Sequence, residues 1–279
     1  PEIVPRPAFQ SAVAWNSGGG QAATVIGPAL GGAALAVTRL PHLVYFIHAV
    51  LALAFAGLLL GVQTAPEQRP PVAASFDSLL EGARYVWRSR ILLAAITLDL
   101  FAVLFGGAVA LLPVYAKDIL QVGPAGLGWL LAAQSIGAVV MTVTLAHRPP
   151  LQQAGPALLR AVALFGIAMI GFGLSHSFLL SLAMLVVAGA SDSVSVVIRM
   201  TLAQLGTPDH LRGRVSAVNS LFITASNQLG DFRAGLMAAW LGTINAVLVG
   251  GVGALLVVLV GRKLFAQLYR VETFDVTRR

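Results

Sequence analysis

The feature that most constrains this chain is a series of apolar stretches, each long enough to cross a lipid bilayer, that recurs along its whole length. A transmembrane helix needs about 20 mostly apolar residues to cross a hydrocarbon core about 30 Å thick. The stretches of this kind are Ala12–Val37, Leu43–Val62, Ile91–Leu112, Ala125–His147, Leu158–Leu174, Phe178–Leu205, Ala217–Leu241 and Ala246–Leu264. The sequence therefore predicts an all-α membrane protein with about eight transmembrane helices.

The composition excludes most other classes of protein. Only 10% of the residues are charged, whereas soluble domains carry about 25%, and the mean hydropathy is +0.85. The net charge of +7 comes from basic residues that stand singly between apolar runs, so nucleic acid is not an expected partner. The sequence contains no cysteine, no phosphate-binding loop and no metal-binding motif. We therefore expect no cofactor, no metal and no enzymatic activity.

The basic residues also predict how the chain is oriented in the membrane. If the first stretch begins in the cytoplasm, 14 of the 18 Lys and Arg residues fall on the cytoplasmic side and only Arg39 and Lys117 fall outside. Cytoplasmic loops carry an excess of Lys and Arg, so this arrangement places the C-terminus in the cytoplasm. Arginine exceeds lysine and Ala, Gly and Val are abundant, which suggests a GC-rich bacterial genome and hence a bacterial cell membrane.

Ionisable side chains inside the apolar stretches are costly enough to be functional candidates. In the seventh stretch, Asp231 and Arg233 are two residues apart and point in different directions, so each needs a partner on another helix. Asp99 lies near the middle of the third stretch, and Asp192 and Arg199 lie in the sixth. Asp192 and Arg199 are seven residues apart, so they share one helix face about 10 Å apart along the axis. We expect Arg199 to extend its guanidinium toward the cytoplasmic interface. Proton coupling would need a carboxylate that takes up and releases a proton as its surroundings open to water, and Asp99, Asp192 and Asp231 are all eligible.

The seventh stretch carries a polar stripe. Ser220, Thr224, Asn227 and Asp231 follow one another at intervals of four, three and four residues, which places them on one face of a helix. Such a face leaves donors and acceptors unpaired if it meets lipid, so it should face a bundle interior or a water-filled cavity. We interpret these side chains as part of a substrate or proton pathway.

Small residues and arginines supply further candidates. In the first stretch, Gly27, Pro28, Gly31 and Gly32 would either kink the helix as a hinge or form a close packing seam with a neighbour. Arg212 and Arg214 precede the seventh stretch, where they would anchor a cytoplasmic loop to anionic lipid or take part in a gate. Residues 76–88 have the spacing of an amphipathic helix, which would be either a lipid-sensing element or a passive strut.

Several motifs resemble those of a known transporter family. The run from Gly27 to Gly32 resembles the antiporter motif in the fifth helix of major facilitator superfamily exporters. The segments Leu112–Asp118 and Arg212–Ser220, continuing to Asn227–Gly230, are similar to those of the transmembrane secretion effector branch. The resemblance implies twelve helices in two halves, of which this chain would supply helices five to twelve.

On this resemblance the chain divides at the proline-containing stretch between the second and third apolar runs. The expected parts are the last two spans of an N-terminal bundle (1–62), a cytoplasmic linker with an amphipathic helix (63–90), a six-span C-terminal bundle (91–265) and a cytoplasmic tail (266–279). The implied partners are a small-molecule substrate, protons, the lipid bilayer and the missing N-terminal helices.

The resemblance implies proton-coupled efflux of a drug or siderophore by alternating access. Two alternatives stay open: a membrane scaffold or sensor that transports nothing, and an inactive fragment of a transporter.

Overall fold

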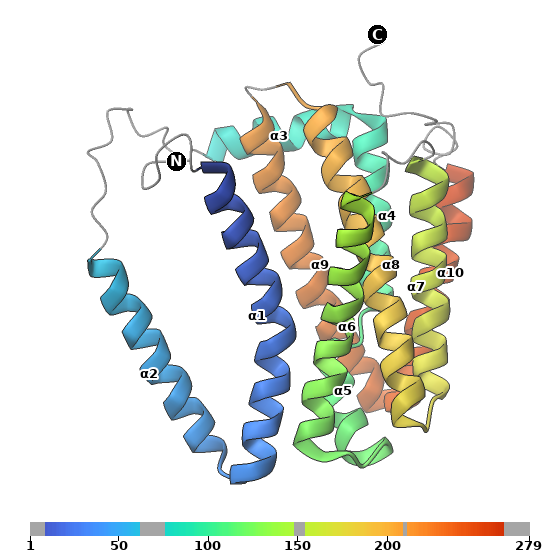
Figure 1. Ribbon diagram of the computed structural model, residues 1–279. Helices are drawn as coiled ribbons and strands as arrows, with labels where there is room; N and C mark the ends of the chain where they lie inside the picture. The colour runs from blue at the N-terminus through green and yellow to red at the C-terminus, as the bar shows by residue number, and fades with distance from the viewer. Residues whose placement is uncertain (1–8, 62–75, 148–153, 209–210, 265–279) are drawn as a thin grey trace.

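The computed structural model describes residues 9–61, 76–147, 154–208 and 211–264, and every regular element in these ranges is a helix (Figure 1). Residues 63–74 of the predicted linker, the loop 148–153 and the tail 266–279 lie outside the described residues. The long helices are α1 (Phe9–Thr38), α2 (Pro41–Leu60), α3 (Phe76–Arg88), α4 (Arg90–Gly106), α6 (Gly123–Ala146), α7 (Ala154–Leu174), α8 (Phe178–Leu205), α9 (Arg212–Leu241) and α10 (Thr243–Leu264). Between α4 and α6 lie the short turns η2 (Val109–Leu111), α5 (Leu112–Val114) and η3 (Tyr115–Ile119).

The prediction of an all-α membrane protein is confirmed. In the described residues, six helical stretches are long and apolar enough to cross a membrane, namely those built on α2, on α4 through η3, and on α6, α7, α8 and α10. The other two expected spans correspond to α1 and α9, which are each 30 residues long. The apolar part of α1 whose side chains the structure describes, Ala22–Thr38, is shorter than these six stretches. In α9, asparagine, glutamine, serine and charged residues lower the mean hydropathy.

The third expected span is not one continuous helix. The α-helix α4 stops at Gly106, and the chain continues through Gly107 and Ala108 in non-helical conformation before η2 begins. η3 is a π-helical turn. The expected helix over Ile91–Leu112 was therefore wrong in its last turn, where two successive glycines weaken the helix.

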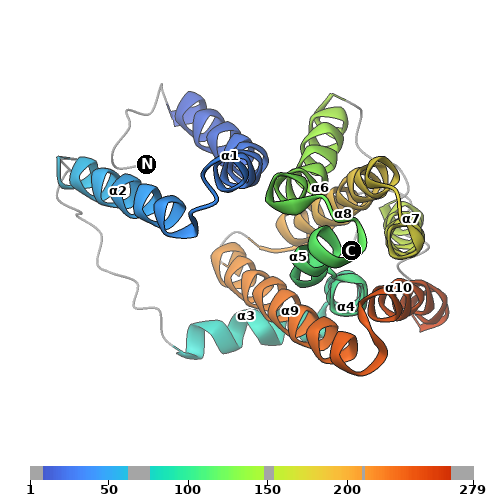
Figure 2. The same cartoon turned by 90° about the horizontal axis from the view of Figure 1, so that it is seen from below.

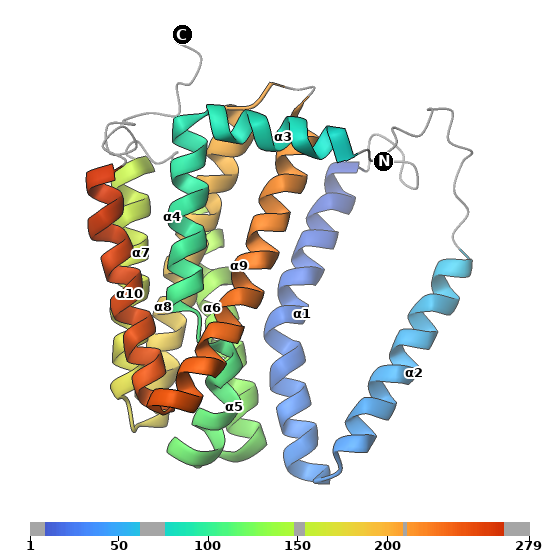
Figure 3. The ribbon, with the colours of Figure 1, turned by 180° about the vertical axis from the view of Figure 1, so that it is seen from behind.

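The helices from α4 to α10 form one bundle, and α1 packs along its α6 edge (Figure 2). α2 leans away from this bundle, and no residue of its apolar stretch Pro41–Leu58 is buried. The amphipathic helix α3 lies across the end of the bundle at which α4 begins, against α9 and α4 (Figure 3).

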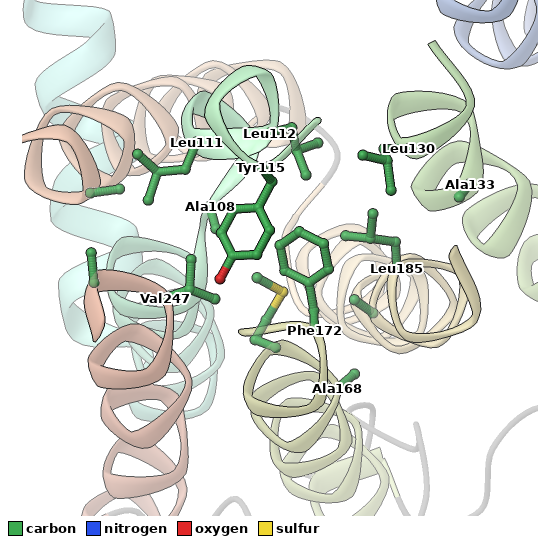
Figure 4. Packing of buried hydrophobic residues seen from close by; sticks show 14 of the residues in the cluster. Ala108, Leu111, Leu112, Tyr115, Leu130, Ala133, Ala168, Phe172, Leu185 and Val247 are labelled. Carbon is green, nitrogen blue, oxygen red and sulfur yellow. The ribbon is translucent and has the colours of Figure 1, made fainter. Parts of the chain in front are cut away.

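Aromatic packing joins η3, in the broken third span, to α7. The rings of Tyr115 and Phe172 lie 4.4 Å apart between centroids, and both side chains are fully buried (Figure 4). The hydroxyl of Tyr115 donates a hydrogen bond to the carbonyl oxygen of Gly173 over 3.2 Å. The buried phenol therefore has the polar partner that a buried tyrosine needs.

The α6–α8 contact depends on glycine at two facing positions. A Cβ atom built on Gly137 would overlap the carbonyl oxygen of Val186, and one built on Gly189 would overlap the carbonyl oxygen of Gln134. The two backbones therefore touch directly. Beside this contact, the hydroxyls of Thr142 and Ser193 form a hydrogen bond of 2.6 Å between α6 and α8. Close backbone approach of this kind is how membrane helices associate without a hydrophobic driving force.

Candidate functional site

The structure joins Asp99 of α4 and Arg199 of α8 in a buried ion pair. The guanidinium Nη1 of Arg199 donates to the Oδ2 carboxylate oxygen of Asp99, and the two residues are 4% and 3% exposed. Arg199 is therefore paired inside the bundle, and the expectation that it extends to the cytoplasmic interface was wrong. Its Nε atom is buried and has no hydrogen-bond partner among the described residues. Pairing is required here because an isolated buried charge is strongly unfavourable.

Asp192 lies on the same face of α8 as Arg199 but does not join this pair. It is half-buried, and within the described part of the chain it has no ion-pair or hydrogen-bond partner. The neighbouring residues Ser191 and Ser193 are buried, and each has a hydrogen bond of its own. Asp192 is thus a carboxylate inside the bundle whose charge no nearby cation balances.

The polar stripe of α9 lies on the exposed side of that helix. Ser220, Thr224 and Asn227 are exposed and Asp231 is half-buried. The opposite face of α9 is the buried one, formed by Val215, Val218, Asn219, Ser226, Gly230 and Ala234. The stripe therefore does not face the interior of this bundle and does not meet the Asp99–Arg199 pair. α9 borders the side of the bundle that is turned toward α1 and α2 (Figure 2).

The glycine-proline motif of α1 makes a close contact with α6, through some of its residues only. A Cβ on Gly32 would lie 2.6 Å from the carbonyl oxygen of Pro124, and a Cβ on Gly128 would overlap the carbonyl oxygen of Pro28. Gly27 and Gly31 have nothing within 4 Å of an added Cβ. α1 continues as one helix through Pro28. The geometry favours the packing-seam interpretation of this motif, with Gly32 as the glycine that the seam requires.

This difference within one motif gives a matched test. We expect Gly32→Val to separate α1 from α6, because its side chain would meet the backbone of Pro124 and Gly128. We expect Gly31→Val to leave the contact intact. The measurement is disulfide formation between cysteines introduced on α1 and α6, in a chain that has no native cysteine. Equal cross-linking in the two variants would contradict the assigned seam.

The arginines that precede α9 contact protein groups. Arg214 forms an ion pair with Glu81 of α3, and Arg212 donates to the carbonyl oxygen of Thr207 over 3.3 Å. A Cβ on Gly82 would lie 2.8 Å from the carbonyl oxygen of Arg214, so α3 and α9 are also in backbone contact. Tyr85 of α3 donates its hydroxyl proton to the carbonyl oxygen of Gly206, beyond the end of α8. α3 thus links the ends of α8 and α9.

Arg233 is a residue of the site that sequence reasoning left without a partner. Its guanidinium donates to the carbonyl oxygens of Leu104 over 2.8 Å, Phe105 over 2.7 Å and Gly107 over 3.4 Å. These carbonyls lie where α4 stops, so their usual helical donors are missing. A cation is favourable at this negative end of the helix dipole. Arg233 therefore stabilises the break in the third span, and no sequence pattern identifies backbone carbonyls as partners.

Replacing Arg233 tests this role. We expect Arg233→Met to destabilise the break by about 1.5–3 kcal/mol, the range for a hydrogen bond to a charged group. The loss should appear locally as faster amide hydrogen exchange between Phe105 and Leu111. Arg160→Met, at an exposed arginine of α7, is the matched control and should leave exchange in this segment unchanged. Protection that persists in Arg233→Met would show that the carbonyls have other donors.

The described residues contain no group of three or more His, Asp or Glu side chains that could hold a metal ion. The polar groups of the candidate site are therefore a buried ion pair, a carboxylate without a partner and an exposed polar helix face. Such groups can bind polar parts of a small molecule or exchange protons.

Comparison with known proteins gives one family. The sequence profile of the transmembrane secretion effector family matches residues 1–278. The chain is 30% identical to the enterobactin exporter EntS of Shigella flexneri over 203 residues. This matched region covers 71% of this chain and 43% of that protein. The enterobactin exporters EntS of two Escherichia coli strains, O139:H28 and O9:H4, are 31% identical over the same length. No solved structure matches the chain.

The matched part covers 43–44% of each of these curated relatives, so the chain spans less than half of their length. The family assignment agrees with the predicted fold and with a transport protein rather than an enzyme.

Proposed function

Because the chain belongs to the transmembrane secretion effector family of major facilitator proteins, we propose that it is part of a secondary active exporter of a small molecule. The observation that carries this proposal is the two-sided character of α9. One face packs against the bundle, while the other exposes Ser220, Thr224 and Asn227. A transmembrane helix keeps such a polar face only where it borders water, protein or a polar substrate.

The substrate that fits this face is an amphipathic molecule with several hydrogen-bonding groups, such as a siderophore or a drug. Hydroxyl and amide side chains offer donors and acceptors without fixed charge, so they suit neutral polar groups. The relatives named as enterobactin exporters support the siderophore class.

We assign proton coupling to Asp192 in the first place. Its carboxylate has no cation partner among the described residues, whereas Asp99 already has Arg199. When water reaches an unpaired carboxylate inside a bundle, the free energy of ionising it falls. When the surrounding protein closes and excludes water, the protonated form is favoured. Alternating exposure to the two sides of the membrane would then move one proton for each cycle.

In this proposal α4–α10 form one half of the transporter, and α1 and α2 belong to a second half whose other helices precede this chain. The halves would rock about the α1–α6 seam. The positive-inside count supports a cytoplasmic C-terminus and a location in the bacterial cytoplasmic membrane.

The proposal is tested in cells that express the full-length gene product and are loaded with a fluorescent amphipathic dye. We expect energised efflux that stops when a protonophore collapses the proton gradient. Asp192→Asn should abolish efflux against a gradient while dye exchange down its gradient continues. Asp118→Asn, at an exposed carboxylate of η3, is the control and should behave as the unmodified protein. If Asp192→Asn pumps normally, Asp192 is not the coupling group.

A scaffold or sensor is the competing function, and an inactive fragment is the other alternative. The scaffold function rests on α3, which contacts the ends of α8 and α9 and would present its remaining face to a partner. It would show no efflux under any gradient. Efflux by the full-length gene product but not by the 279-residue chain would identify the chain as an inactive fragment.

A further inference from the structure

An apolar groove of about 360 Å³ lies between α4 and α10. Its walls include Phe101 and Phe105 on α4 and Leu256 and Val260 on α10. Phe101, Leu256 and Val260 are 41%, 54% and 52% exposed. Since both helices belong to the membrane-spanning set, these exposed apolar side chains face the hydrocarbon of the bilayer. α10 is at the side of the molecule opposite α2, so α2 does not cover the groove (Figures 1 and 2).

Glycines and stacked rings shape the groove. Phe101 and Phe105 are stacked with their centroids 6.2 Å apart. Gly253 lies against Phe105 and Gly261 lies against Leu98, so each glycine replaces a side chain that would otherwise fill the space. The groove therefore runs along the helix pair. It is lined by residues 97–105 and 253–261, and each of these stretches extends about 12 Å along its helix axis. A narrow apolar groove of this length fits part of one extended hydrocarbon chain.

Two cations lie above the groove at the end where α4 begins and α10 ends. Arg90 is seven residues before Thr97 and eleven before Phe101, so it lies on the face of α4 that lines the groove. Lys263 is seven residues after Leu256 and lies on the corresponding face of α10. Both residues are exposed. The single carboxylate in these two helices, Asp99, is buried in its pair with Arg199.

The depths of these groups match one leaflet of a bilayer. The contacts of Gly261 with Leu98 and of Gly253 with Phe105 fix an antiparallel register in which Lys263 is level with residue 96. Lys263 therefore lies about 9 Å deeper than Arg90, and its flexible stem can extend toward the interface. From Arg90 to the far end of the groove is about 22 Å, somewhat more than the roughly 15 Å of hydrocarbon in one leaflet.

We infer that this groove binds one acyl chain of an anionic phospholipid, with Arg90 and Lys263 holding its phosphate headgroup. The groove supplies the apolar part of the site and the two cations supply the preference for negative charge. The positive-inside orientation puts these cations at the cytoplasmic leaflet, which is the leaflet with a negative surface potential. The bound lipid would hold α4 and α10 together beside the break in α4.

The test places a fluorophore beside the groove without filling it. The chain has no cysteine, so Val252→Cys, one turn from Leu256, carries a single bimane label. Ile167→Cys on the exposed face of α7 is the reference position. Both labelled proteins are reconstituted in phosphatidylcholine vesicles that contain brominated phosphatidylglycerol or brominated phosphatidylcholine at the same mole fraction. Bromine quenches bimane only at close range, so quenching reports which lipid lies beside the label.

We expect phosphatidylglycerol to quench the label at 252 more strongly than phosphatidylcholine, and both lipids to quench equally at 167. Arg90→Gln and Lys263→Gln should each weaken the preference about fivefold, and Arg160→Gln should leave it unchanged. Val260→Trp, which fills the groove at constant charge, should abolish the preference. High salt should reduce it.

Three results would overturn the inference. Equal quenching by the two lipids at 252 would show that no headgroup is selected, and a preference that survives Arg90→Gln and Lys263→Gln would assign it to other groups. Disulfide-linked dimers through Leu256→Cys, with weak quenching by both lipids, would show that a second copy of the chain occupies the groove. Unchanged thermal unfolding of each variant shows that the fold is retained.

Discussion

Asp99→Ala is expected to lower the free energy of unfolding by about 3–5 kcal/mol, because removing one partner of a buried ion pair leaves the other charge buried and alone. The partner in this case is Arg199, which is 3% exposed and would be left as an unpaired buried charge. Its Nε atom already lacks a hydrogen-bond partner among the described residues. The loss is measured by denaturation in mixed detergent micelles, followed by circular dichroism.

A double substitution separates the charge from the packing at this position. Asp99→Leu together with Arg199→Met removes both charges and keeps the volume apolar, so most of the stability should return, since such replacements of buried pairs are often neutral or better. If Asp99→Ala costs no more than a surface substitution, about 0.5 kcal/mol, the two side chains are not a buried pair. If the double variant stays as unstable as Asp99→Ala, the loss comes from packing and not from the unpaired charge.

Gly137→Ala is expected to destabilise the bundle by about 1–3 kcal/mol, the usual cost of forcing an extra carbon into a packed interior. The added methyl group would overlap the carbonyl oxygen of Val186, a backbone atom that cannot move aside without shifting α8. Gly189→Ala should have a similar effect through the carbonyl oxygen of Gln134. Both substitutions are measured in the same detergent denaturation.

Gly235→Ala on α9 is the control for this prediction. Nothing lies within 4 Å of a Cβ at position 235, so alanine should stabilise the helix by about 0.5–1 kcal/mol through its better helix propensity. Gly137→Ala and Gly235→Ala should therefore change the free energy of unfolding in opposite directions. Destabilisation of equal size at 137 and 235 would show that the effect belongs to glycine in any helix and not to the α6–α8 contact.

The helices themselves could be predicted because each depends on residues close together in the chain. Apolar length predicted α8 at Phe178–Leu205, and amphipathic spacing predicted α3 over Phe76–Arg88; both helices have these bounds in the structure. The break after Gly106 was missed, because hydropathy continues unchanged through Gly107 and Ala108 while the hydrogen-bonding pattern does not. Arg233 stabilises that break from another helix, over 128 residues of sequence from Phe105.

The candidate site was only partly predictable for the same reason. Helical spacing predicted that Asp192 and Arg199 share one face of α8 and that the polar stripe lies on one face of α9, since each pattern depends on a single helix. The partner of Arg199 is Asp99, 100 residues away in sequence, and only the packing of α4 against α8 brings the two together. The direction of the polar stripe also depends on neighbours. Polarity alone requires that Asn227 avoid lipid, but it does not distinguish the interior of this bundle from its exposed side.

The central claim, secondary transport, is tested most directly by substrate movement in proteoliposomes that contain the purified full-length protein. A pH gradient is imposed across the vesicles, and a catecholate siderophore and a fluorescent amphipathic dye are offered in separate experiments. For a secondary transporter we expect accumulation of one of these compounds that depends on the direction of the gradient and is lost in Asp192→Asn but kept in Asp118→Asn. Equal levels of both compounds with and without the gradient, in vesicles whose protein retains its helical circular dichroism, would contradict secondary transport.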